Sequence, residues 1–195
     1  MDWDKFLGKD KDVKYQKHLP EGENGFGKIN GRYYIAGDRG GYGQATTKLP
    51  ADIREVSLLV SANTCAGLVF GKDKLLYGTR APGKKMNYYL PNGKRIYGKN
   101  QWKDTAVSGW YPHNFYAVKF VLSDDKIRTY ISYDAKTWKL DAEIKRTADL
   151  AGAPAELLVG WGVKGKYPLL RNLKKNYAPQ PRYPHVRFFS NVNWK

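Results

Sequence analysis

The chain has 195 residues, of which 42% are hydrophobic and 14% aromatic, so it can bury a core and is not disordered. No apolar run approaches the roughly 20 residues that a membrane-spanning helix needs, and the single cysteine, Cys65, excludes an intrachain disulfide or a cysteine-cluster zinc site. Lys and Arg number 34 against 18 Asp and Glu, which gives a net charge of +16.

The first half of the chain predicts short strands separated by turns. In residues 54–61 the apolar side chains Val56, Leu58 and Val60 alternate with a second set, which is typical of a strand with one buried face. Residues 66–70 and 74–77 are expected to form the next two strands. A hairpin then follows at Pro91-Asn-Gly, because Asn-Gly accepts the positive φ angles of a tight turn. We expect its strands at residues 86–90 and 94–97.

The second half continues this pattern with a longer hairpin around Asp124-Asp125. Its first strand, residues 114–123, alternates cleanly, with Tyr116, Val118, Phe120 and Leu122 on one face. Its second strand is expected at residues 126–133, and two more strands are expected at residues 155–163 and 185–192. Helical patterns are confined to residues 148–151 and 169–176.

About ten or more short strands without a long helix predict an all-β fold, a two-sheet antiparallel β-sandwich of the jelly-roll type. The sequence has no internal repeat and no linker, so we expect one domain over residues 1–195. Residues 1–12 and 178–184 are expected to wrap its surface.

The excess positive charge lies in two segments. Residues 70–103 carry nine Lys or Arg against one Asp, and residues 164–195 carry eight against none, so each contributes +8. If the fold brings them together, they would attract a polyanion such as an acidic polysaccharide, a nucleic acid or an anionic membrane surface. An ordinary solvated basic surface is the alternative.

Residues 116–138 form a hairpin that ends in Ser132-Tyr-Asp-Ala-Lys-Thr-Trp138. This hairpin resembles one that is common in concanavalin A-like jelly-roll domains of carbohydrate-active proteins, where the run is usually Ser-x-Asp-Gly-Lys-Thr-Trp. The strand Ala66-Gly-Leu-Val-Phe70 is similar to another strand of those domains. The resemblance covers roughly residues 53–162 and implies the fold more than the activity, since one fold hosts many functions.

A second resemblance concerns polysaccharide lyases on the same fold. Some of them have an arginine strand followed by a strand that ends Tyr-x-Tyr-Leu-Pro. Here Thr79-Arg80 precedes Asn87-Tyr-Tyr-Leu-Pro91, with Asn87 in place of the first tyrosine. A lyase neutralises a uronate carboxylate and then removes the neighbouring proton with a base. The resemblance and the residue types together give the catalytic candidates Arg80, Tyr88, Tyr89 and His113.

Binding candidates are basic and aromatic side chains near these residues or in strands and loops that a sugar could reach. They are Lys94, Arg95, Trp110, Tyr111 and Tyr130. A non-catalytic carbohydrate-binding module therefore stands beside the lyase as an alternative. Glycoside hydrolysis requires two facing carboxylates, and only Glu55 and Glu156, on separate strands, are candidates for meeting in space.

The remaining expectations concern cofactors, partners and location. No spacing of His18, His113 and His185 suggests a catalytic metal; Asp124, Asp125 or Asp134 would be the ligands of a structural calcium ion, although all three also suit turns. A nucleic-acid partner ranks below a polysaccharide because no RNA- or DNA-binding motif is present. We expect a monomer that is extracellular, with a cytoplasmic location left open.

Overall fold

Strands in which apolar and polar side chains alternate, in the middle of the chain, form the centre of the molecule. In the computed structural model β5 (Glu55–Ser61) pairs antiparallel with β10 (Phe115–Leu122), and β10 pairs with β11 (Lys126–Ser132). Leu58 lies opposite Val118, so the apolar faces of these strands coincide. The structure describes residues 14–18, 25–29, 31–37, 43–61, 64–72, 74–79, 85–101, 115–134, 136–161 and 185–195.

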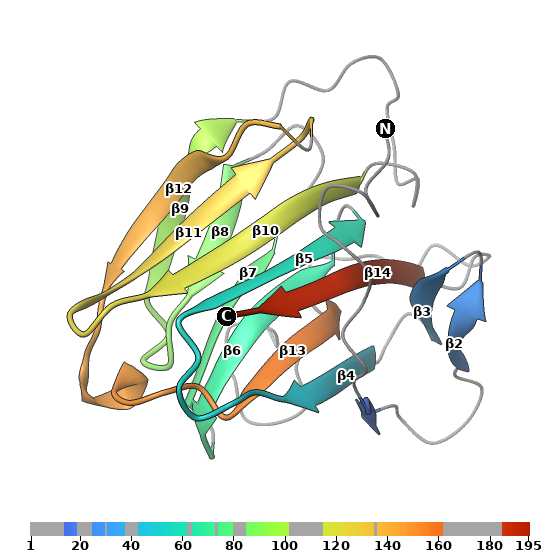
Figure 1. Cartoon of the computed structure of the whole chain (residues 1–195), viewed down its shortest axis with the longest axis horizontal. Helices are drawn as coiled ribbons and strands as arrows, with labels where there is room; N and C mark the ends of the chain where they lie inside the picture. The colour runs from blue at the N-terminus through green and yellow to red at the C-terminus, as the bar shows by residue number, and fades with distance from the viewer. Residues whose placement is uncertain are drawn as a thin grey trace.

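Two seven-stranded antiparallel sheets stack face to face (Figure 1), which confirms the predicted β-sandwich of the jelly-roll type. In sheet A the order is β1 (Gln16–His18), β4 (Gly43–Lys48), β13 (Glu156–Trp161), β6 (Cys65–Gly71), β7 (Lys74–Thr79), β8 (Lys85–Tyr89) and β9 (Arg95–Gln101). In sheet B the order is β12 (Lys139–Lys145), β11, β10, β5, β14 (His185–Trp194), β3 (Arg32–Gly37) and β2 (Gly25–Ile29).

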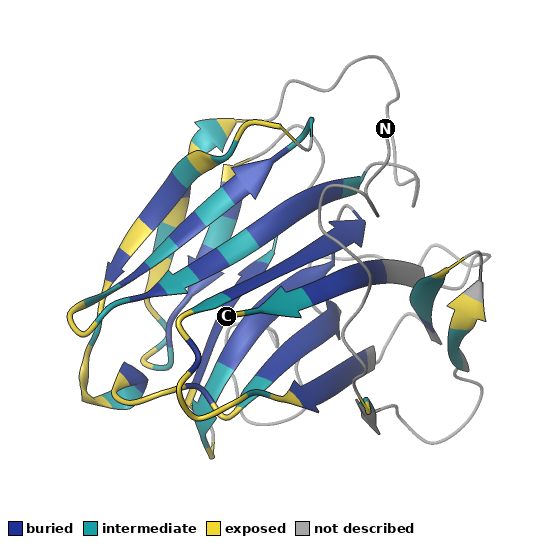
Figure 2. Cartoon of the chain, in the orientation of Figure 1, coloured by how far each residue is buried: buried dark blue, intermediate teal, exposed yellow. Residues whose placement is uncertain are grey.

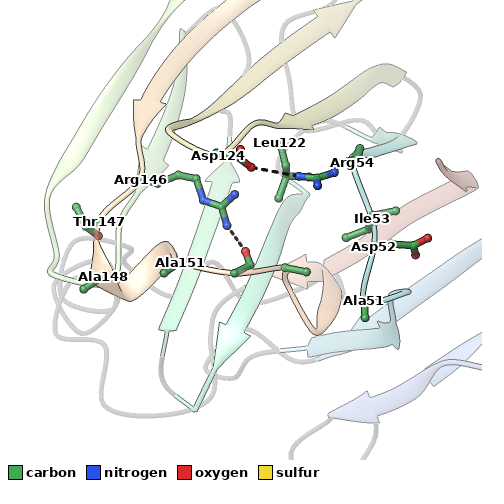
Figure 3. Close-up of a pocket in the computed structure, with 12 residues that line it drawn as sticks. Ala51, Asp52, Ile53, Arg54, Leu122, Asp124, Arg146, Thr147, Ala148 and Ala151 are labelled. Atoms are coloured by element: carbon green, nitrogen blue, oxygen red, sulfur yellow. Dashed lines mark hydrogen bonds and ion pairs between the residues drawn. The ribbon is translucent and has the colours of Figure 1, made fainter.

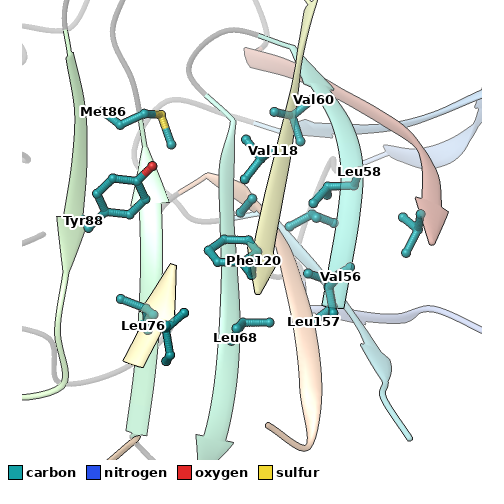
Figure 4. Close-up of a cluster of buried hydrophobic side chains, with 14 of the residues drawn as sticks. Val56, Leu58, Val60, Leu68, Leu76, Met86, Tyr88, Val118, Phe120 and Leu157 are labelled. Carbon is teal, nitrogen blue, oxygen red and sulfur yellow. The ribbon is translucent and has the colours of Figure 1, made fainter. Parts of the chain in front are cut away.

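The core fills the space between the sheets, where the inward residues of both are buried (Figures 2 and 4). Val56, Leu58 and Phe120 of sheet B and Leu68 and Leu76 of sheet A are fully buried there. Each such side chain contributes about 1.5–3 kcal/mol relative to an exposed one. Burial of this apolar set is the main energetic reason why the two sheets stay together.

Apolar side chains are also buried on the outer faces of the two sheets. On sheet A these are Cys65, Leu75, Tyr77, Tyr89 and Leu158. On sheet B, Leu59 and Ala117 pack with Phe115 and Trp138. Burial of an apolar residue therefore does not by itself place it between the sheets.

The predicted β8–β9 hairpin forms around Pro91, Asn92 and Gly93. Gly93 has a φ of 82°, a conformation that glycine adopts without strain. The side chain of Asn92 accepts a hydrogen bond from the Lys94 N–H at 3.0 Å, and the Leu90 N–H donates to the Lys94 carbonyl at 2.9 Å. The turn chemistry thus fixes the register of β8 against β9.

Five strands were not predicted from the sequence. Four of them, β1 to β4, precede residue 50 and are rich in glycine and polar residues, so their pairing depends on neighbouring strands. The fifth, β12, carries a bulge that breaks its alternation. The short helix predicted at residues 148–151 is present as a 3₁₀ turn, η1 (Ala148–Leu150).

Other sequence-based expectations lie outside the described residues, namely the helix at 169–176 and the wrapping segments 1–12 and 178–184. The single domain over residues 1–195 stays a prediction. Within the described ranges, no helix is long and apolar enough to cross a membrane.

Candidate functional site

The outer face of sheet A at β7, β8 and β9 gathers tyrosines and basic residues in two rows across the strands. The strand register defines the rows. One row contains Tyr77, Tyr89 and Arg95, and the next contains Thr79, Asn87 and Tyr97. Side chains directly opposite each other on antiparallel strands are about 5 Å apart at their Cβ atoms, so neighbours within a row can interact.

Aromatic packing holds the first row. The rings of Tyr77 and Tyr89 stack with centroids 4.9 Å apart and planes at 15°. Both residues are buried, with 2% and 8% of their surface exposed. Tyr97 in the second row is 57% exposed, and the Arg95 guanidinium lies 4.6 Å from the centre of its ring. Arg95 also donates a hydrogen bond to the Tyr97 hydroxyl.

Positive charge on this hairpin is not neutralised locally. Residues 74–101 contain seven Lys or Arg and no Asp or Glu. Lys85, Lys94, Arg95 and Lys99 are exposed, and none of them forms an ion pair with a carboxylate in the described part of the chain. We call these four residues and Tyr97 the basic face.

Sheet B differs, because four of its cations form ion pairs, whereas Lys139 and Lys145 on its edge strand form none in the described residues. Lys119 and Lys195 lie 4.0 and 3.8 Å from Glu55, and Lys126 and Arg128 lie 3.7 and 3.3 Å from Glu143. Partly exposed pairs of this kind contribute little stability, but they cancel the local field. An anion would therefore be attracted more strongly to the basic face of sheet A than to these paired positions of sheet B.

The predicted site residues divide among several places. Tyr89, Lys94 and Arg95 lie together on the β8–β9 hairpin. Arg80, Trp110, Tyr111 and His113 fall outside the described residues. Tyr88 and Tyr130 lie elsewhere, for reasons that follow from strand geometry.

Tyr88 points into the core, against the sequence-based expectation that it acts as a catalytic base. Consecutive residues of a strand face opposite sides, so Tyr88 and Tyr89 cannot both face outward. Tyr88 is fully buried, and its hydroxyl donates to Asp141 Oδ2 at 2.7 Å. Burial, reinforced by the Asp141 charge, raises the pKa of Tyr88 well above its ordinary value. A phenol enclosed between the sheets does not reach a polymer at the surface.

Tyr130 lies on β11, on the outer face of sheet B. Its neighbours Thr129 and Ile131 are buried, and the Lys119 amine is 5.4 Å from its ring centre. The same amine lies 4.6 Å from the Trp138 ring. Because the two outer faces point away from each other, Tyr130 does not line one surface with Tyr89 and Arg95.

Glu55 and Glu156, the carboxylates considered for hydrolysis, do not face each other. Glu55 is on β5 of sheet B, where it pairs with Lys119 and Lys195. Glu156 is on β13 of sheet A, next to Leu157, which points into the core. The two carboxylates thus lie on opposite outer faces and cannot flank one glycosidic bond.

Asp134, a candidate calcium ligand, organises its own turn. Its Oδ1 atom accepts hydrogen bonds from the N–H groups of Lys136 and Thr137, each at 2.8 Å, and from the Ser132 hydroxyl at 3.2 Å. The bonds from Thr137 and Lys136 lower the pKa of Asp134 to about 2. Asp124 faces Arg54 at 3.5 Å, and Asp125 accepts from Ser123 at 3.0 Å. In the described residues, no three His, Cys, Asp or Glu side chains gather as metal ligands would.

A cavity of about 460 Å³ lies where the β4–β5 link, the β10–β11 turn and the η1 segment meet (Figure 3). Arg146 in its wall donates hydrogen bonds to the backbone carbonyls of Leu150 and Ser123, each at 2.8 Å, and to that of Gly152. Four alanines line much of the remainder. Asp124 in the wall faces Arg54, so the polar contacts of this cavity serve to hold the three loops together.

Asp141 is a buried carboxylate that sequence reasoning missed. It lies on β12 at a bulge, and its Oδ1 atom accepts from the Asn100 N–H at 2.9 Å and from Asn100 Nδ2 at 3.0 Å. With the bond from Tyr88, it joins β8 and β9 of sheet A to the edge of sheet B. Gly98 makes room for it, because a Cβ at that position would lie 2.7 Å from Asp141 Cγ. The strand that carries Tyr97 and Lys99 is thereby anchored from behind.

Tyr97 and Lys99 were also missed: Tyr97 was the last residue of the predicted strand and was not singled out, and Lys99 lies beyond it. The alternation of Arg95, Tyr97, Lys99 and Gln101 with smaller or apolar residues was the available signal. All four are exposed, and Ile96, Gly98 and Asn100 face inward.

No protein-family model matches this sequence, and no curated protein matches it. Among solved structures, a functionally unknown protein from Saccharomyces cerevisiae is similar, with a TM-score of 0.55, 13% identity, and 92% of this chain and 96% of that chain covered. The GH43 protein BlXynB from Bacillus licheniformis has a TM-score of 0.50 and 12% identity, with 83% of this chain covered. The chain spans only 32% of the length of that protein. A GH131 β-glucanase catalytic domain from Podospora anserina has a TM-score of 0.41 and 10% identity, with 84% and 70% covered. The likenesses to the first two structures support the β-sandwich fold.

Proposed function

We propose that this protein binds an anionic polysaccharide at the basic face of sheet A. The observation that carries the proposal is that Lys85, Lys94, Arg95 and Lys99 are exposed on the same hairpin as the exposed Tyr97 ring and have no carboxylate partner in the described residues. The Arg95 guanidinium lies 4.6 Å from the centre of that ring. Unpaired cations bind carboxylate or sulfate groups strongly when they also donate hydrogen bonds. An exposed aromatic ring offers an apolar surface to a sugar ring. The extracellular location and the monomeric state expected from the sequence stay predictions.

A pair of charge-matched variants tests this proposal. We expect Lys94→Gln with Arg95→Gln to weaken binding to the preferred anionic polymer by about tenfold or more, equivalent to about 1.4 kcal/mol. The control is Lys126→Gln with Arg128→Gln, which removes the same two charges from sheet B and should change the affinity by less than about twofold. Affinity is measured by calorimetry on alginate, polyglucuronate, pectate, hyaluronan and heparin, with neutral glucans as references. Equal losses in both variants would indicate attraction to the net charge alone, and binding only to neutral glucans would refute the proposal.

Cleavage of a uronate polymer by β-elimination is a second candidate function. The cross-strand pair of Tyr89 and Arg95 favours it, because the pair sets a phenol beside a guanidinium. In that reaction Arg95 would neutralise the uronate carboxylate, and Tyr89 would remove the C5 proton. The C4=C5 double bond would form as the C4–O glycosidic bond breaks, and the leaving oxygen would take up a proton from Tyr89 or from water. We expect Tyr89→Phe to abolish unsaturated product, read by its ultraviolet absorbance on the same polymers, while leaving binding measurable. Binding without any such absorbance by the wild-type protein would restrict the site to recognition.

A further inference from the structure

The outward residues of β9 form a single line along the strand. Arg95, Tyr97, Lys99 and Gln101 occupy every second position and are all exposed. A strand rises about 3.3 Å per residue, so neighbours in this line are about 7 Å apart and Arg95 is about 13 Å from Lys99. An aromatic ring therefore stands between two cations along β9, in a stretch where the register against β8 shifts between Asn87 and Lys85.

Across the sheet, from β9 towards β7, the surface offers much less to a ligand. The row that contains Arg95 continues into Tyr89 and Tyr77, which are 8% and 2% exposed. The row that contains Tyr97 continues into Asn87 and Thr79, which carry neither a charge nor an aromatic ring. Apart from Lys85 on β8, which lies opposite Gln101, the exposed cationic and aromatic groups of these rows are concentrated along β9.

The position of β9 also suits an extended ligand. It is the terminal strand in the order of sheet A, so no further strand of that sheet covers its outer edge in the described residues. Its backbone is held from behind by the bond from the Asn100 N–H to Asp141. A rigid track loses little conformational entropy when a ligand binds, which favours affinity.

From this arrangement we infer that an anionic polysaccharide lies lengthwise along β9, with one sugar ring against Tyr97 and acidic groups on either side bound by Arg95 and Lys99. The inference rests on the proposed function and specifies the direction in which the polymer crosses the surface. Arg95 contributes twice, because its guanidinium both borders the Tyr97 ring and is available to a carboxylate or sulfate. Lys99 supplies the second positive charge, on the side of Tyr97 opposite to Arg95 along the strand.

The test compares substitutions along β9 with one across the sheet, using polygalacturonate and heparin as probes. We expect Lys99→Gln to weaken binding about fivefold or more and to lower the slope of log affinity against log salt by about one, as for the loss of one bound cation. Tyr97→Ala is expected to weaken binding about tenfold, and Tyr97→Phe much less, because it retains the ring. Asn87→Ala, on the neighbouring strand, should leave the affinity within about twofold. Melting temperatures of all four variants establish that they are folded.

The outcomes separate the two proposals. Wild-type binding that is weakened by Asn87→Ala but not by Lys99→Gln would overturn the course along β9 and leave the proposed function intact. Failure of the wild-type protein to bind either probe would overturn both. Tighter binding to single-stranded oligothymidylate than to either polysaccharide would also overturn both and would assign the track to nucleic acid, whose bases stack on aromatic rings in a similar way.

Discussion

Replacing Asp141 by alanine is expected to lower the free energy of unfolding by about 3 kcal/mol, because three donors lose their acceptor and a buried donor left without one costs about 1–3 kcal/mol. These donors are the buried Tyr88 hydroxyl and the partly buried N–H and Nδ2 groups of Asn100. For a chain of this length the melting temperature should fall by roughly 6–12 °C. The change is measured by thermal and urea unfolding.

Two further variants show whether the hydrogen bonds cause this loss. Asp141→Asn preserves the shape of the side chain and an oxygen that accepts from Asn100. Its loss of stability should therefore be less than half of the loss caused by Asp141→Ala. Asp149→Ala removes a half-exposed carboxylate that lies 3.6 Å from Lys74, and it should cost less than about 1 kcal/mol. An Asp141→Ala variant as stable as Asp149→Ala would show that Asp141 does not join the two sheets.

Gly98→Ala is expected to destabilise the protein by about 2–3 kcal/mol, which is the range for overpacking a filled interior. The added Cβ would lie 2.7 Å from both Cγ and Oδ1 of Asp141, and closer still to Oδ2. The carboxylate cannot yield cheaply, because moving it breaks its bonds to Tyr88 and Asn100. Urea unfolding of the variant measures the effect.

Gly71→Ala is the matched control, because its Cβ would meet only Lys74 Cδ at 3.8 Å, an ordinary contact. Its stability should stay within about 0.5 kcal/mol of the wild type. A double-mutant cycle identifies the partner of Gly98: in an Asp141→Ala background, Gly98→Ala should cost much less than in the wild type. Additive losses would mean that the clash is with another group.

The hairpins were predictable because their determinants are local. Pro91, Asn92 and Gly93 fix a turn whatever the rest of the chain does, and the alternation from Tyr116 to Leu122 gives the buried face of β10 directly. The strand β12 was not predictable in the same way. Its bulge places Leu140 opposite Tyr130 and Ala142 opposite Thr129, so Asp141 falls between two registers and the alternation of the sequence is lost.

For the candidate site, sequence reasoning located the region but not its geometry. It drew attention to Tyr89, Lys94 and Arg95, which lie together on the hairpin. It grouped Tyr130 with these three residues, since all four are aromatic or basic residues of predicted strands or turns. Nothing in a linear pattern tells which sheet a strand will join. Tyr88 was grouped with Tyr89 through a motif resemblance, although the alternation of a strand sends adjacent side chains to opposite faces.

The sequence by itself determined the all-β class, the central strands and hairpins, and the concentration of positive charge in residues 70–103. Those properties depend on residue types and short-range periodicity, which act before the chain is folded. Only the tertiary structure decided which sheet each strand entered, and hence that Tyr130 and Arg95 lie on opposite faces. It also brought Asp141 to Asn100, 41 positions apart in the chain, because contact between distant strands depends on how the two sheets pack rather than on either segment alone.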